Sequence, residues 1–314
     1  MSTSQPLGHA LGPARTLGRP GPGPLPAALL RKVNLIVRRR IDGMLAGDHR
    51  SWALGEGAEL AQVRPYVAGD DVRLIDWNVT ARTGEPHIRV NVAERAVETW
   101  LLLDTSASMT FGTADRRKWD VAEGVSLAVG NFAVRRGNRL AVATFGDQNP
   151  FTSPARQGNR GLLALLLALR REPDLEPTGP TSLGTALSRL GRLARRRAVI
   201  VVVSDFRGPR DWRPRLLQLA SRHDVVAIEI RDPREQDLPD VGDLWLVDPE
   251  SGKQLRVDTR SRKLRERFGA DAAAEREELT RELRSLGVSH LTLSTSGDWL
   301  RRLVGFLQTE GRRR

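Results

Sequence analysis

Residues 98–108 read ETWLLLDTSAS, and residues 198–205 read AVIVVVSD. Both stretches are aliphatic runs of strand length, and each run leads directly to a carboxylate, Asp104 or Asp205. A near-continuous aliphatic strand is typical of a sheet that helices cover on both faces, because neither side of the strand is left for water. We therefore expect both runs to be buried strands of a parallel sheet, with polar residues at their carboxyl ends.

Extended and helical patterns alternate around these two runs. Such alternation predicts an α/β fold with a doubly wound, mostly parallel sheet and helices on both faces, of the Rossmann type. We expect further strands at 139–145, 225–230 and 288–293, and helices at 119–134, 162–169, 183–193, 216–220 and 299–307. After Pro233 the pattern changes to a hairpin of 243–247 with 254–257, followed by a charged helix over about 260–286.

The sequence divides into three parts. Residues 1–26 hold six Pro and five Gly, which predicts a disordered leader. Residues 27–96 comprise an amphipathic helix at 27–45 and a polar, β-rich region with short extended runs at 59–67 and 87–92. Residues 97–310 form the α/β domain, with the hairpin and long helix as an insertion near 236–286. We expect the amphipathic helix to dock on its own domain, with peripheral membrane contact as the alternative.

Charge and composition exclude several classes of protein. The chain of 314 residues carries a net charge of +12, of which +6 lies in residues 1–50 and +3 in Arg312–Arg314. Because the excess lies in the tails, a specific nucleic-acid interface is not expected. With no cysteine, disulfide scaffolds and thiol chemistry are excluded. No apolar run approaches the roughly 20 residues of a membrane span, so we expect a soluble, cytoplasmic protein.

Three predicted loops at strand ends carry oxygen ligands. Asp104 begins D-T-S-A-S, the segment 179–184 reads GPTSLG before a helix, and Ser204-Asp205 ends the second aliphatic run. Ligands of open α/β sheets bind where strands end. Oxygen donors without His or Cys favour Mg²⁺, then Mn²⁺ or Ca²⁺, with a coordination position left for an anionic partner group. The alternative is that these Ser and Asp residues only cap helices.

This ordered set resembles the metal-ion-dependent adhesion site of von Willebrand factor A domains. The resemblance assigns five metal-contacting positions and implies a fold of the von Willebrand A type. One departure is Pro180, which stands where Gly is common in that loop. The five positions are Asp104, Ser106, Ser108, Thr181 and Asp205.

A second set of motifs closely resembles a bacterial family of unknown function, DUF58. It comprises G-D-H-R-S at 47–51, R-P-Y at 64–66, G-D-D-V-R-L-I-D-W at 69–77 and A-R at 81–82. The resemblance covers about residues 30–308 and implies work with MoxR-type AAA+ ATPases as an adaptor or co-chaperone. The motif is a partner surface, a second anion or metal site, or a buried ion-pair network in which Arg73, Arg82 or Arg89 neutralises its acids. Its residues are Arg64, Tyr66, Gly69, Asp70, Asp71, Arg73, Asp76, Trp77 and Arg82.

Catalytic motifs are scarce, so we expect a non-enzymatic binding protein. The rival is a haloacid-dehalogenase-like phosphotransferase with Asp104 as nucleophile. Such a site needs a general acid two residues later, where this chain has Ser106, and it needs a lysine, of which the chain has only four. No P-loop motif occurs, and the five histidines are scattered without metal-ligand spacing.

Overall fold

The computed structural model describes residues 61–91, 97–112, 115–135, 137–171, 173, 182–248 and 252–313. The predicted leader at 1–26, the predicted helix at 27–45 and the candidate ligand Thr181 lie outside these residues.

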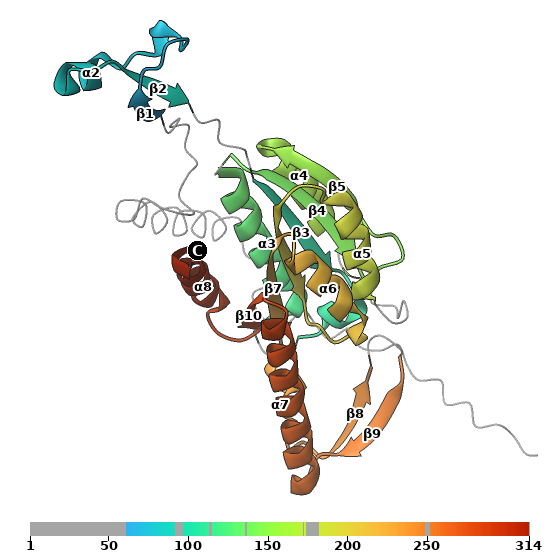
Figure 1. Ribbon diagram of the computed structural model, residues 1–314. Helices are drawn as coiled ribbons and strands as arrows, with labels where there is room; N and C mark the ends of the chain where they lie inside the picture. Colours follow the sequence, from blue (N-terminus) through green and yellow to red (C-terminus); the bar gives the residue numbers. More distant parts are fainter. Residues whose placement is uncertain are drawn as a thin grey trace, which may run out of the picture.

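A six-stranded sheet forms the centre of the fold, in the order β10-β7-β6-β3-β4-β5 (Figure 1). All neighbours pair in parallel except β5, which is antiparallel to β4. This confirms a mixed α/β protein with a mostly parallel sheet. The strands are β3 (Glu98–Asp104), β4 (Arg139–Phe145), β5 (Thr152–Gln157), β6 (Ala198–Ser204), β7 (Asp224–Arg231) and β10 (Ser289–Ser294).

Alternate residues of the strands fill two apolar cores, one on each face of the sheet. On β3, Leu101 and Leu103 pack against one set of helices, whereas Trp100 and Leu102 pack against the other. This is the arrangement that a strand buried on both sides requires. The first face holds α3 (Lys118–Arg135), α4 (Asn159–Leu169) and α8 (Trp299–Arg313); the second holds α5 (Leu183–Leu193), α6 (Arg213–Ala220) and α7 (Arg262–Ser285).

Two smaller β units flank the sheet along the chain. The strands β1 (Ala61–Pro65) and β2 (His87–Asn91) pair in antiparallel fashion, and α2 (Trp77–Thr83) lies between them in the sequence. The hairpin of β8 (Asp243–Val247) and β9 (Gln254–Asp258) precedes α7, where the sequence predicts it. Four short 3-10 helices complete the described elements: η1 (Val72–Leu74), η2 (Ala107–Thr110), η3 (Arg210–Trp212) and η4 (Pro233–Glu235).

Two elements differ from the prediction. Strand β5 has the sequence TSPARQ, which lacks an apolar alternation and contains Pro154; proline is tolerated there because β5 is an edge strand. Helix α2 lies in a region that the sequence suggested to be extended and turn-rich. It begins because Asp76 accepts hydrogen bonds from Asn78 N and Val79 N, and it ends at Gly84 in the left-handed conformation.

Helices in the described part of the chain include none that is both long and apolar enough to cross a bilayer.

Candidate functional site

The predicted metal-binding residues meet at the carboxyl edge of the sheet. Strands β3 and β6 are parallel neighbours, so Asp104 at the end of β3 and Asp205 just after β6 lie at the same edge. Both carboxylates, Ser106 and Ser108 line one cavity of about 10 Å³, together with Ser204. A cavity of this size holds about one water molecule or one small ion. Four of the five predicted ligands are therefore adjacent, and Thr181 lies outside the described residues.

Asp104 is a buried carboxylate that neutral groups hold in place. Its Oδ1 accepts a hydrogen bond from Ser106 N at 2.9 Å, and its Oδ2 accepts one from Ser204 Oγ at 2.5 Å. Burial and the nearby charge of Asp205 raise the pKa of Asp104 to about 7. The cavity therefore concentrates negative charge that a bound cation would relieve.

The two serines of the D-T-S-A-S segment face each other rather than cap a helix. Ser106 stands at the N-cap of η2, but its side chain makes no capping hydrogen bond. Instead, the Oγ atoms of Ser106 and Ser108 lie 3.0 Å apart, and both residues are buried. For Ser106, this arrangement disfavours the interpretation of the motif as a simple helix cap. It leaves the Ser106 hydroxyl at Asp104 and the Ser108 hydroxyl at Asp205.

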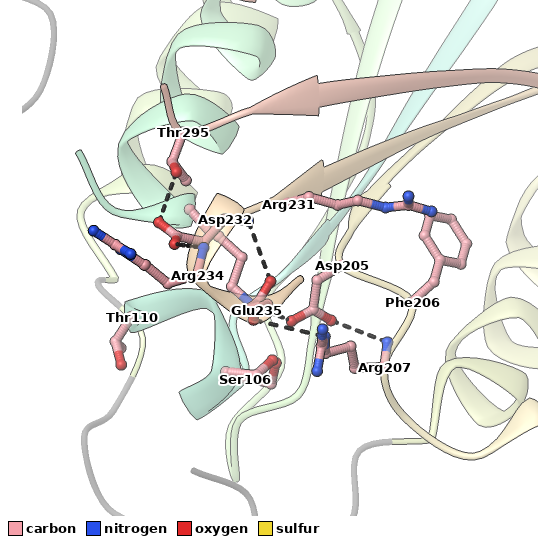
Figure 2. A network of polar contacts seen from close by, with 12 residues as sticks. Ser106, Thr110, Asp205, Phe206, Arg207, Arg231, Asp232, Arg234, Glu235 and Thr295 are labelled. Carbon is pink, nitrogen blue, oxygen red and sulfur yellow. Dashed lines mark hydrogen bonds and ion pairs between the residues drawn. The ribbon is translucent and has the colours of Figure 1, made fainter. Parts of the chain in front are cut away.

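Asp205 forms an ion pair that the sequence did not predict. Its Oδ1 accepts a hydrogen bond from Arg207 N at 3.1 Å, and its Oδ2 lies 2.5 Å from Lys118 Nζ. Lys118 Nζ also lies 2.7 Å from Glu235 Oε1. Figure 2 shows the Asp205 and Glu235 side chains close together in this network. Burial alone would raise the pKa of Asp205, but the charge and hydrogen bond of Lys118 hold it below its usual value.

Three further site residues were missed in the sequence: Lys118, Ser204 and Glu235. Ser204 was visible beside Asp205, yet its bond to the opposite carboxylate depends on strand pairing. Glu235 belongs to a D-x-x-E capping box with Asp232, a pattern that the sequence does display. The contact from Lys118 to Asp205 spans 87 residues and had no local signal.

The chemistry of the cavity's side chains indicates which kind of cation they could bind. The described residues contain no group of three or more His, Cys, Asp or Glu side chains that could hold a metal ion. The cavity instead offers two carboxylates and serine hydroxyls, with the pKa of Asp104 raised to about 7. Mg²⁺ is bound by one or two carboxylates and keeps several waters, so this oxygen set fits a hard divalent cation.

The Gly69–Trp77 motif holds two capping aspartates, Asp71 and Asp76. The predicted ion-pair network with Arg73, Arg82 or Arg89 stays a prediction, because the Arg89 side chain lies outside the described residues. Asp71 accepts a hydrogen bond from Arg73 N, and Asp76 caps α2. The Arg82 Nε donates a hydrogen bond to the carbonyl of Asn78. The ion pair observed in this unit joins Arg64 and Asp70, with N–O distances of 2.6 and 2.7 Å. The other motif residues do not line the cavity: Tyr66 N bonds the carbonyl of Pro86, Gly69 has φ +108°, and Trp77 is 71% exposed.

Residues 62–278 match the family described as "Protein of unknown function DUF58". The chain belongs to this family. The uncharacterized protein Rv1480 of Mycobacterium tuberculosis is 40% identical to this DUF58 protein over 288 residues. The matched region covers 91% of this chain and 90% of that relative. The uncharacterized protein MAV169 of Mycobacterium avium is 40% identical over 161 residues, 51% of this chain and 94% of the relative.

Two solved structures share a more distant similarity with this DUF58 protein. The conserved hypothetical protein BatB from Bacteroides thetaiotaomicron is 14% identical with a TM-score of 0.45. An aerotolerance-related membrane protein from Bacteroides fragilis is 16% identical, also with a TM-score of 0.45. Each covers 70% of this chain and 100% of the solved chain. Similarity at this level carries no information about function.

Proposed function

We propose that this DUF58 protein is a non-enzymatic adaptor with a von Willebrand A-like domain that binds a protein partner through a divalent cation, Mg²⁺ before Mn²⁺ or Ca²⁺. The observation that carries the proposal is the convergence of Asp104, Ser106, Ser108 and Asp205 on one cavity of about 10 Å³. Thr181 completes the proposed ligand set on the strength of the sequence motif alone.

The role that we propose for each side chain follows from its contacts. Asp104 supplies the charge that holds the cation, because its surroundings disfavour its ionised form until a positive charge is present. Ser106 adds a neutral oxygen at Asp104, and Ser108, whose Oγ lies 3.0 Å from that of Ser106, adds one at Asp205. When bound, the cation would provide an open coordination position for a carboxylate of the partner.

The proposed partner is a MoxR-type AAA+ ATPase, its client, or both, in the assembly or maturation of protein complexes in the cytoplasm. This part of the proposal rests on the DUF58 family resemblance, and the acidic contact group rests on the chemistry of the cavity. The exposed Trp77 and its motif are a further candidate contact surface, since large aromatic residues dominate many protein interfaces.

Capture from a bacterial lysate tests this function. The tagged full-length protein is incubated with lysate in Mg²⁺ or in EDTA, and the eluted proteins are identified by mass spectrometry. We expect an AAA+ ATPase in the Mg²⁺ sample that chelation releases. Recovery of the same proteins in equal amounts with and without EDTA would contradict a metal-dependent adaptor.

One observation favours the phosphotransferase alternative: Lys118 supplies a lysine at the site. However, Lys118 is fully buried, and it pairs with Asp205 rather than Asp104. Ser106 also cannot act as a general acid near neutral pH. We expect no hydrolysis of p-nitrophenyl phosphate in Mg²⁺ above the rate without protein. Activity that an Asp104→Asn variant lacks would establish the alternative instead.

A further inference from the structure

Lys118 is a charged side chain completely enclosed by protein. Its exposed fraction is 0%, and its Nζ contacts Asp205 Oδ2 at 2.5 Å and Glu235 Oε1 at 2.7 Å. Burial alone would lower the pKa of Lys118, but the two carboxylates raise it above its usual value, so the ammonium stays charged. An unpaired buried ammonium is strongly unfavourable, which is why two acids accompany it.

The two carboxylates of the cavity are therefore not equivalent. Both carboxylates accept hydrogen bonds at both oxygens, but Asp205 Oδ2 also pairs with the Lys118 ammonium, while its Oδ1 accepts from Arg207 N. The hydrogen bonds to Asp104 come from neutral groups, the Ser106 amide and the hydroxyls of Ser204 and Ser106, and the ion pairs of the described residues do not include it. A second cation placed against Asp205 would have to share its carboxylate with a fixed positive charge.

We propose that Lys118 is a specificity-determining residue: a tethered cation that withholds Asp205 from direct ligation and so favours Mg²⁺ over Ca²⁺. The inference rests on the proposed metal-dependent function. Mg²⁺ needs only one or two carboxylates and keeps its remaining waters, whereas Ca²⁺ collects six to eight oxygens, often from several carboxylates. With Asp205 held by Lys118, Asp104 is the one carboxylate of the pair left to bind directly.

The contacts of Lys118 also set the net charge of the site. Asp104, Asp205 and Glu235 carry three negative charges when ionised, and Lys118 together with Arg207, whose Nε lies 3.6 Å from Glu235 Oε1, offsets two of them. Removing the ammonium would make the cluster more negative by one charge and free a carboxylate. A change of one charge at contact distance in a partly buried site alters an affinity by about tenfold or more.

The test compares Mg²⁺ and Ca²⁺ binding by titration calorimetry in the full-length protein and two variants. In Lys118→Met, which keeps the length of the side chain, we expect tighter binding of both ions, with Ca²⁺ gaining at least about tenfold more than Mg²⁺. Lys118→Met/Glu235→Gln restores the net charge of the unaltered cluster while still freeing Asp205. It should keep the Ca²⁺ gain if ligation, rather than net charge, is the cause.

Asp237→Asn, which removes an exposed carboxylate outside the cavity, is the control, and we expect its preference for Mg²⁺ to be that of the unaltered protein. Because Lys118→Met removes the cationic partner of Asp205 and leaves Glu235 only its contact with Arg207, its folding is followed by thermal unfolding. If it unfolds without metal, Ca²⁺ should restore a transition more effectively than Mg²⁺. A folded double variant with the unaltered Mg²⁺ preference would overturn the inference.

The two proposals fail separately. If the unaltered protein binds Mg²⁺ through Asp104 but the variants show the same ion preference, only the role of Lys118 is wrong. If the unaltered protein binds no divalent ion and the variants bind Ca²⁺, the metal-dependent function is wrong and the role of Lys118 stands. Absence of binding in every form contradicts both.

Discussion

Replacement of Asp104 by Asn is expected to weaken Mg²⁺ binding by about two orders of magnitude or more, measured by titration calorimetry. Loss of a group that merely orients a metal ligand already costs 10–100-fold, and Asp104 is the directly ligating carboxylate of the proposed site. Asn preserves the size of the side chain and an oxygen acceptor, so the fold should persist. Capture of a protein partner in Mg²⁺ should be lost together with the ion.

The same substitution should not reduce, and should even increase, stability in EDTA. Burial raises the pKa of Asp104 to about 7 from 3.8, so the folded state disfavours the ionised form. A raised acid pKa means that the folded protein binds more protons than the unfolded chain. Stability of the metal-free protein therefore falls as pH rises from about 4 to 7, and Asn removes that penalty.

Two measurements complete this prediction. Because protons compete for Asp104, Mg²⁺ affinity of the unaltered protein should rise with pH up to about 7 and then level off. Asp237→Asn removes an exposed carboxylate outside the cavity and should leave Mg²⁺ binding unchanged. Equal Mg²⁺ affinity in Asp104→Asn and the unaltered protein would mean that the cation, if any, binds elsewhere.

The fold was predictable where hydrophobicity is continuous. The aliphatic runs of β3 and β6 specify strands buried on both faces, and the structure places them side by side at the centre of the sheet. Strand β5 was not predictable, since TSPARQ carries no apolar alternation and its pairing to β4 depends on tertiary structure. Helix α2 depends on the Asp76 cap more than on an apolar stripe, because none of its own residues is buried.

At the candidate site, residues that directly follow a strand could be predicted from the sequence, and residues that other elements contribute could not. Asp104 and Asp205 each end an aliphatic run, so a parallel sheet brings them to one edge without further information. The ion-pair partner of Asp205, Lys118, could not be predicted in this way. Lys118 begins α3 and reaches the site only because α3 packs under the sheet, so its contact reflects the three-dimensional arrangement and not any spacing in the sequence.

Gly146→Ala is expected to disrupt the candidate metal site, although Gly146 is not one of the proposed ligands. Gly146 follows β4 with φ +98°, a conformation that L-residues rarely adopt. A Cβ atom there would lie 2.7 Å from Ser106 N and 3.0 Å from Asp104 Oδ1, closer than such atoms approach. We expect the free energy of unfolding to fall by about 2–4 kcal/mol, and the stabilisation by Mg²⁺ to be largely lost.

Gly137→Ala separates the two causes of that effect. Gly137 precedes β4 with φ +70°, but nothing lies within 4 Å of a Cβ placed on it. It therefore carries the backbone strain alone, which costs about 1–2 kcal/mol. Urea denaturation with and without Mg²⁺ should show similar backbone penalties in both variants, but loss of the Mg²⁺ response only in Gly146→Ala. If both variants keep the full Mg²⁺ response, the loop of Gly146 does not shape the cavity, since a displaced Asp104 Oδ1 could not bind the ion normally.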